Sequence, residues 1–268
     1  MRLHRWFLAL SCAVPLAAAS PALAKAEKTP AKEVVSFGTL QAPSLDAARG
    51  QALAWLKGVG KADATTLKNF EALWKDPDRP LLDKVTDTLA LGDNQAAKLL
   101  KQARDPEAPA PTKVPDLLRD AKRPAFYRAN LALAYAKALS NRRVYEEALD
   151  VLKAAKPDQV VDPAGYFFHK AVAEHALLLP QEASRSIVGV LEDVAEAPER
   201  YKLVAMLMLY DMQSWQTKDL GEIARKMDNV ERRLELARGG PKTQKIQKEV
   251  VARLDEIIKK LEKQQGGS

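Results

Sequence analysis

An internal sequence repeat with a period of 35 residues, within the segment 127–194, is the feature that most constrains the fold. Apolar residues recur there every three or four positions, as in a helix that buries one face, and prolines mark the breaks between helices. Small residues at matching positions allow paired helices to approach closely. The segment is therefore predicted to form two consecutive helical hairpins, 125–156 and 164–195. The positions that match under the shift are Ala136 and Ala171, Ala148 and Ala183, and Leu152 and Ile187.

The second helix of the first hairpin resembles that of a tetratricopeptide repeat. The run YEEAL at 145–149, followed by Leu152, Ala155 and Pro157, carries the resemblance, and the spacing is close to the ~34 residues of such a unit. The pattern departs from the family at the glycine-type position, which is alanine in both units, and the terminal proline comes three residues early. The bulky first-helix residue is Ala132 in the first unit. The resemblance covers the two hairpins and, more loosely, a third unit.

The resemblance implies a short stack of hairpins whose first helices form a concave face that binds extended peptides or other proteins. Asn and Lys side chains there could hold a peptide backbone or a carboxylate, but they do not match the carboxylate clamp of the family. The alternative is that these are solvated residues, with Phe168 in the core. Carried over by position, the candidate partner-binding groove consists of Asn130, Lys137 and Asn141 from the first unit and Phe168 and His175 from the second.

The segment 1–24 has the features of a cleavable secretory signal peptide. Arg2 and Arg5 precede an apolar run, and Ala22-Leu23-Ala24 supplies small residues at a cleavage site. The run is shorter than the ~20 residues that span a bilayer. The single cysteine, Cys12, lacks the leucine three residues earlier that a lipoprotein signal requires, so it is predicted to be removed with the signal peptide. A periplasmic or extracellular protein without disulfides is expected.

The charge pattern argues against nucleic acid as a partner. The formal net charge is +7, and removal of the signal peptide leaves +5. Acidic and basic residues are interleaved and do not gather into a basic stripe, which disfavours nucleic-acid binding. A moderate positive charge favours attraction to anionic envelope polymers. No segment of the mature chain approaches membrane-spanning length.

The predicted fold class is all-α: a short TPR-like solenoid of helical-hairpin repeats with a small helical module before it and an antiparallel helical hairpin or coiled coil after it. Prolines make the segment before the repeats an extended linker or a surface strap. Trp55, Phe70 and Trp74 lie on apolar stripes, so core packing is expected in preference to a stacking platform. The predicted divisions are a signal peptide (1–24), a flexible tether (25–43), the module (44–103), the linker (104–116), the repeats (117–216), the hairpin (217–264) and a tail (265–268).

Two patterns distinguish the C-terminal part. The helix expected at 201–215 is almost continuously apolar from Leu203 to Tyr210, as in a helix buried on all sides, and the mature methionines near it are expected to pack. The helices expected next carry apolar residues at heptad spacing, which predicts a seam that caps the stack or pairs with another copy. The predicted inward residues are Leu220, Ile223, Met227, Val230, Leu234 and Ala237, and Val250, Leu254, Ile257 and Leu261.

The sequence offers no catalytic constellation. His169 and His175 are six residues apart and point to different faces of a helix, so a shared metal site is not expected. No G-x-S-x-G, H-E-x-x-H or phosphate-binding loop occurs. We therefore expect a non-catalytic binding or assembly scaffold without cofactors, whose partner is a protein or peptide. The alternative is a structural envelope protein that self-associates through 217–264, and an enzyme is the third hypothesis.

Overall fold

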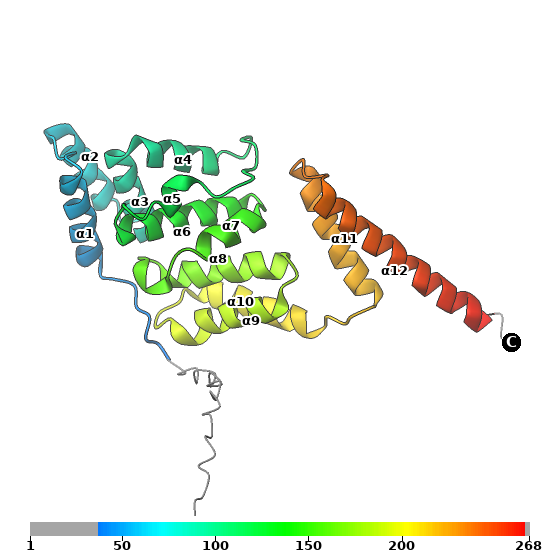
Figure 1. The fold of residues 1–268 in the computed structure, drawn as a ribbon. Coiled ribbons are helices and arrows are strands. Elements are labelled where there is room, and N and C mark those ends of the chain that lie inside the picture. Colours follow the sequence, from blue (N-terminus) through cyan, green and yellow to red (C-terminus); the bar gives the residue numbers. More distant parts are fainter. Residues whose placement is uncertain (1–36, 266–268) are drawn as a thin grey trace, which may run out of the picture. The chain divides into compact units, whose positions relative to one another are not determined.

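The computed structural model describes residues 37–265, and every regular element in that range is a helix (Figure 1). The all-α prediction is thus confirmed for this range. The predicted signal peptide, most of the tether and nearly all of the tail lie outside it. None of the described helices is both long and apolar enough to cross a membrane. The α-helices are α1 (Leu45–Gly58), α2 (Ala64–Lys75), α3 (Leu81–Gly92), α4 (Asn94–Arg104), α5 (Asp116–Arg119), α6 (Ala125–Asn141), α7 (Tyr145–Leu152), α8 (Pro163–Ala176), α9 (Pro180–Val188), α10 (Glu199–Gln213), α11 (Leu220–Glu235) and α12 (Pro241–Gln265).

Short polar side chains start several of these helices. Ser44 accepts a hydrogen bond from the Ala47 amide (3.2 Å), and Asp63 accepts one from the Thr66 amide (3.0 Å). Ser44 and Asp63 are the N-caps of α1 and α2, where a side-chain oxygen satisfies an amide that has no partner within the helix. Pro163 and Pro180 occupy the first turns of α8 and α9, where the missing amide hydrogen costs nothing.

Consecutive helices pack in pairs: α3 with α4, α6 with α7, and α8 with α9. The first helices of the pairs also contact one another, α3 with α6 and α6 with α8, and α8 contacts α10. Figure 1 shows the pairs following one another in sequence order. Leu152 and Ile187 are fully buried, as are the alanines at 136, 148, 171 and 183.

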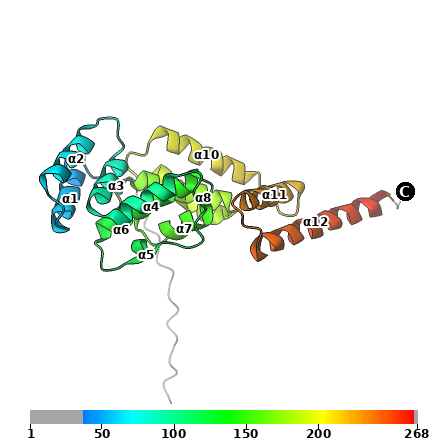
Figure 2. The same ribbon diagram turned by 90° about the horizontal axis from the view of Figure 1, so that it is seen from above.

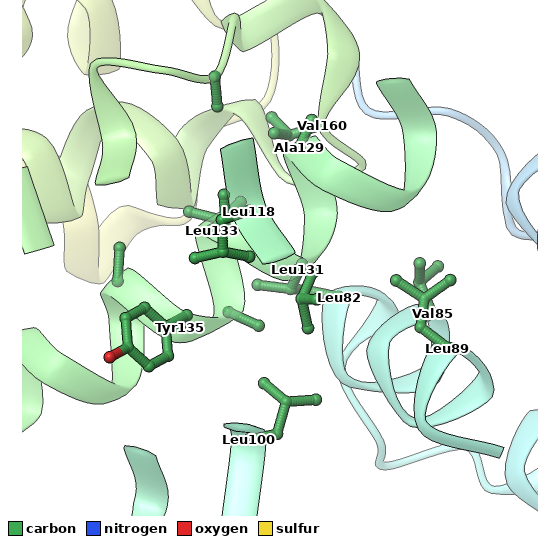
Figure 3. Close-up of a cluster of buried hydrophobic side chains, with 14 of the residues drawn as sticks. Leu82, Val85, Leu89, Leu100, Leu118, Ala129, Leu131, Leu133, Tyr135 and Val160 are labelled. Carbon is green, nitrogen blue, oxygen red and sulfur yellow. The ribbon is translucent and has the colours of Figure 1, made fainter. Parts of the chain in front are cut away.

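One hydrophobic cluster runs from α1 to α8 without a break at the proline-rich segment 104–116. Figure 3 shows part of it, where Leu82 of α3, Leu100 of α4, Leu118 of α5 and Leu131 of α6 converge. Arg142 donates to the carbonyl of Ala108, which holds the segment against the end of α6. The segment is therefore a strap over a shared core. Trp55, Phe70 and Trp74 are buried in the same cluster, which confirms their packing role.

Helix α10 is not buried on all sides, contrary to the prediction. Ala205, Met208 and Met212 face α8 and α9, but four larger side chains lie on the other side and are exposed. The reason is its position: among the described helices none packs against that side of α10. The uniform apolar sequence therefore marks a helix with one unpartnered face. The exposed side chains are Leu203 (57%), Met206 (50%), Leu207 (58%) and Tyr210 (76%).

Helices α11 and α12 contact each other, but the predicted seam does not lie between them. Ile223 and Val250 are buried, whereas Leu220, Met227 and Leu234 are exposed by 65, 54 and 49%. The physical reason is that α11 turns its opposite side toward α7. The most deeply buried long side chains of α11 are Arg232 and Arg233.

An ion cluster joins α11 to α7. Glu146 accepts hydrogen bonds from both terminal nitrogens of Arg232 (2.9 and 3.0 Å) and from Arg233. Arg238 donates to Glu147 at 2.9 Å and to the Pro111 carbonyl at 2.6 Å. Burial raises the pKa of Glu146, but the hydrogen bonds and charge of Arg232 outweigh it and hold that pKa at about 2. The cluster therefore stays ionised at neutral pH.

The end of the predicted tether is ordered against the segment after α9. Leu40 donates to the Asp193 carbonyl (3.0 Å) and accepts from the Ala195 amide (3.0 Å). That segment begins with a π-helical turn, Gly189–Asp193, where the predicted second hairpin had a continuous helix. A Cβ at Gly189 would lie 2.4 Å from the Phe167 ring, so glycine is required for this close approach.

Candidate functional site

The charged cavity between α3 and α6 is the most polar concave feature near the predicted groove. Its volume is about 420 Å³. Asp83 and Asp87 lie one turn apart on α3, and Lys137 lies one turn before Asn141 on α6, so each helix presents a pair of polar side chains to the space. The lining residues are Arg79, Pro80, Asp83, Asp87, Arg104, Ala134, Lys137, Ala138 and Asn141.

Three cations share two carboxylates in this cavity. Arg79 binds Asp87 through Nε at 2.9 Å, and Arg104 lies 3.3 Å from Asp87 and 3.6 Å from Asp83. Lys137 Nζ is 3.6 Å from Asp83. The hydrogen bond that Arg79 donates to Asp87, with the charges of Asp87 and Asp83, raises the pKa of Arg79. Because positive groups outnumber negative ones, the cavity has donor capacity left for an anionic group such as a carboxylate.

Polar groups of α8 and α10 continue from this cavity. The carboxylate of Asp162 caps α8 through the Gly165 amide (2.7 Å), and burial raises its pKa while the charges of Lys137 and Arg200 oppose the rise. Tyr201 lies under the guanidinium of Arg200, 5.2 Å from its ring centre. We call this set of polar side chains, whose charges influence one another, the polar face: Asp83 of α3, Lys137 of α6, Asp162 before α8, His169 of α8, and Arg200 and Tyr201 of α10.

His169 is the buried member of the polar face. Burial, followed by the charge of Lys137, lowers its pKa to about 4, so the ring is neutral at pH 7. Its Nε2 atom is buried and makes no hydrogen bond to any described residue. The rings of Phe168 and Tyr201 lie 5.4 and 6.4 Å away. His169 is therefore buried beside two aromatic rings.

The structure brings together two of the five predicted groove residues. Lys137 and Asn141 line the same cavity. Asn130 is fully buried: its oxygen accepts from the Val161 amide (2.8 Å) and its amide donates to the Phe126 carbonyl (2.8 Å). Including Asn130 in an open groove was therefore wrong, because its side chain links α6 to the segment before α8.

The other two predicted residues lie at contacts between α8 and α10. Phe168 stacks on Tyr201 with ring centres 4.1 Å apart, so it is half-buried in packing. His175 bonds Asp211 (2.8 Å), which also accepts from the indole of Trp215 (3.0 Å). His169 and His175 share no site, and nowhere in residues 37–265 do three potential metal-binding side chains gather.

Sequence reasoning missed the α3 and α4 side of the cavity. Arg79, Asp83 and Asp87 are spaced four residues apart, and Arg104 ends the next helix. This periodicity of charge is the signal in the sequence, but the proline-rich segment 104–116 separates it from the predicted repeats. The packing of α3 on α6 joins the two.

Comparisons with known proteins add no relative. No protein-family model, curated protein or solved structure matches the chain.

Proposed function

We propose that the protein is an exported, non-catalytic scaffold of TPR-like helical repeats that binds a protein or peptide partner on its polar face. The single observation that carries the proposal is the cavity between α3 and α6. Lys137 and Asn141, two residues implied by the family resemblance, line it together with Arg79 and Arg104. In this interpretation the pairs α3/α4, α6/α7 and α8/α9 are successive units and α10 follows as the first helix of the next.

The charge of the cavity favours a partner with an acidic side chain or a terminal carboxylate. Arg104 divides its contacts between Asp83 and Asp87, and both contacts are longer than 3.2 Å. A carboxylate entering between Arg104 and Lys137 would gain charge-assisted hydrogen bonds, while Asp87 keeps its hydrogen bond to Arg79. Arginine suits this task because its planar donors match carboxylate geometry. An acidic peptide segment is therefore the proposed class of ligand.

The proposed compartment rests on the sequence of 1–24. Fractionation of native cells, followed by N-terminal sequencing of the mature protein, tests it directly. We expect the protein in the periplasm or medium with an N-terminus close to Lys25. Recovery in the cytoplasm with Met1 retained would overturn this part of the proposal.

The binding proposal is tested by affinity capture from the native envelope fraction. The bait variants are Lys137→Glu, which reverses a charge in the cavity, and Lys68→Glu, which reverses an exposed charge on α2. We expect Lys137→Glu to lower recovery of the specific partners by about tenfold or more, since like charges then face an acidic ligand. Lys68→Glu should recover them as the wild type does. Equal recovery by all three baits, or equal loss by both variants, would contradict the proposal.

A further inference from the structure

The C-terminal hairpin carries an apolar stripe on each of its two helices, and both stripes are exposed. On α11 the residues recur every seven positions, which is the spacing that keeps side chains on one side of a packed helix. On α12 they recur at spacings of three, four and three. The stripes consist of Leu220, Met227 and Leu234 on α11, and Val251, Leu254, Ile258 and Leu261 on α12.

The two stripes open on the same side of the hairpin. Met227, Val230 and Leu234 of α11 and Val250 and Val251 of α12 line one groove of about 680 Å³. Arg232, which bonds Glu146, is about 160° around α11 from the groove residue Leu234 at ~100° per residue. The groove therefore lies on the side of the hairpin that faces away from α7.

The end of α12 has no partner within the hairpin. The contacts between the helices run from Arg233–Thr243 (2.8 Å) through Lys226–Glu249 (3.2 Å) to Arg253, which donates to the Lys218 carbonyl just before α11. Residues after 253 consequently extend past α11, as the red end of α12 shows in Figures 1 and 2. Leu254, Ile258 and Leu261 lie in this extension, where no residue of the described range 37–265 covers them.

The charges beside the groove indicate what kind of partner covers these apolar residues. Acidic residues Asp228, Glu231 and Glu235 line the edge of the groove on α11. The contacts Lys226–Glu249 and Arg233–Thr243 place 228–235 level with 241–248 of α12. That part of α12 contains Lys242, Lys245 and Lys248 and no acidic residue. A two-fold axis parallel to the helices of the hairpin would place α11 of one copy beside α12 of the other. Residues 228–235 of one copy would then lie at the same height along the axis as residues 241–248 of the other.

We propose that a second copy of this chain docks on the groove, so that two hairpins form an antiparallel four-helix bundle. The apolar stripes of both copies then lie inside the bundle, where their burial drives association. Asp228 and Glu231 of one copy face Lys248 of the other, which favours this pairing over α11 against α11. The contact is isologous, so it closes at two copies. Self-association stands independently of partner binding on the polar face.

The test is the molar mass of the purified, exported protein by light scattering across micromolar concentrations. We expect twice the chain mass for the wild type and a single-chain mass for Met227→Glu combined with Leu234→Glu. The matched control, Leu203→Glu with Leu207→Glu, places the same charges on the exposed face of α10 and should keep the doubled mass. Circular dichroism checks that both double variants remain helical. A wild-type monomer at all concentrations, or dissociation caused only by the α10 variant, overturns the proposal.

A charge exchange tests the orientation and does not depend on disrupting the apolar stripes. Glu231→Lys and Lys248→Glu should each weaken the dimer by about tenfold, and the two together should restore the wild-type dissociation constant. Additive weakening in the combined variant would contradict the placement of α11 against α12 of the second copy.

Discussion

The pair α6/α7 and the hairpin α11/α12 are held in place by different forces. Between α7 and α8 the closely packed side chains are apolar, and Leu152 is completely buried. Between α7 and α11 they are arginines and glutamates, with Arg232 and Arg233 converging on one carboxylate of Glu146. Helix α7 therefore makes an apolar contact on one side and an ionic contact on the other.

This difference has physical consequences. Apolar burial is non-directional and does not depend on the ionisation of any group. A buried ion pair adds little net stability relative to apolar packing, but removal of one member leaves the other charge buried and unpaired. The ionic contact should thus be the one that a single polar substitution or a change of pH can release, with the apolar contacts intact.

The largest expected effect comes from Glu146→Gln. The amide cannot neutralise Arg232 and Arg233, whose side chains are only 3 and 9% exposed. Loss of the pairing should lower the stability of the α7–α11 contact by about 3–5 kcal/mol, which urea titration will detect as earlier release of α11. Glu182→Gln is the matched control, because its ion pair with Arg185 is exposed and should change stability by about 1 kcal/mol or less. Equal losses of stability in Glu146→Gln and Glu182→Gln would contradict the difference between the buried and the exposed ion pair.

Leu152→Ala should act on the other contact of the same helix. It removes a fully buried side chain between α7 and α8, and such a cavity costs about 2–5 kcal/mol. We expect global unfolding at lower urea concentration. Leu207→Ala on the exposed side of α10 should change stability by less than about 0.5 kcal/mol. If the two alanine variants were equally stable, the assignment of the core would be wrong.

Buried His169 of α8 and Glu146 in the contact between α7 and α11 should contribute to stability in different pH ranges. His169 has a folded pKa of about 4, below the unfolded value of 6.5, so the folded state binds fewer protons and loses up to about 3 kcal/mol as pH falls from 6.5 to 4. Glu146 has a folded pKa of about 2 against 4.5, so its contribution is complete above pH 4.5 and declines toward pH 2.

Thermal unfolding from pH 7 to pH 3 measures these ranges. His169→Gln should flatten the dependence between pH 6.5 and 4, and Glu146→Gln should flatten only the part below 4.5. An unchanged slope above pH 4.5 in His169→Gln would contradict a lowered pKa for this histidine, because the folded and unfolded states would then bind its proton equally.

Helix positions were predictable from the sequence, but the outward faces of the last helices were not. Prolines located the starts of α8 and α9 because that signal is local. The apolar run of α10 and the heptads of α11 identified helices with apolar faces. They could not say whether a partner is present within the same chain. Burial of Arg232 and Arg233 depends on Glu146, 86 residues earlier in the chain, and no local pattern contains that information.

The candidate site was predictable only in part, for a similar reason. Lys137 and Asn141 followed from the position of a first helix in the resemblance. The carboxylates of Asp83 and Asp87 come from α3, beyond the proline-rich strap. Asn130 shows the opposite case, because a polar residue on a helix can bond a neighbouring backbone as readily as face solvent.

Hydrogen exchange of the α11 amides, compared between wild type and Glu146→Gln, tests the central difference between the two contacts most directly. We expect faster exchange throughout α11 in the variant, with α6 and α8 unchanged, because the ionic contact opens separately from the apolar core. Unchanged protection of α11, or faster exchange in α6 and α8 to the same extent, would contradict it.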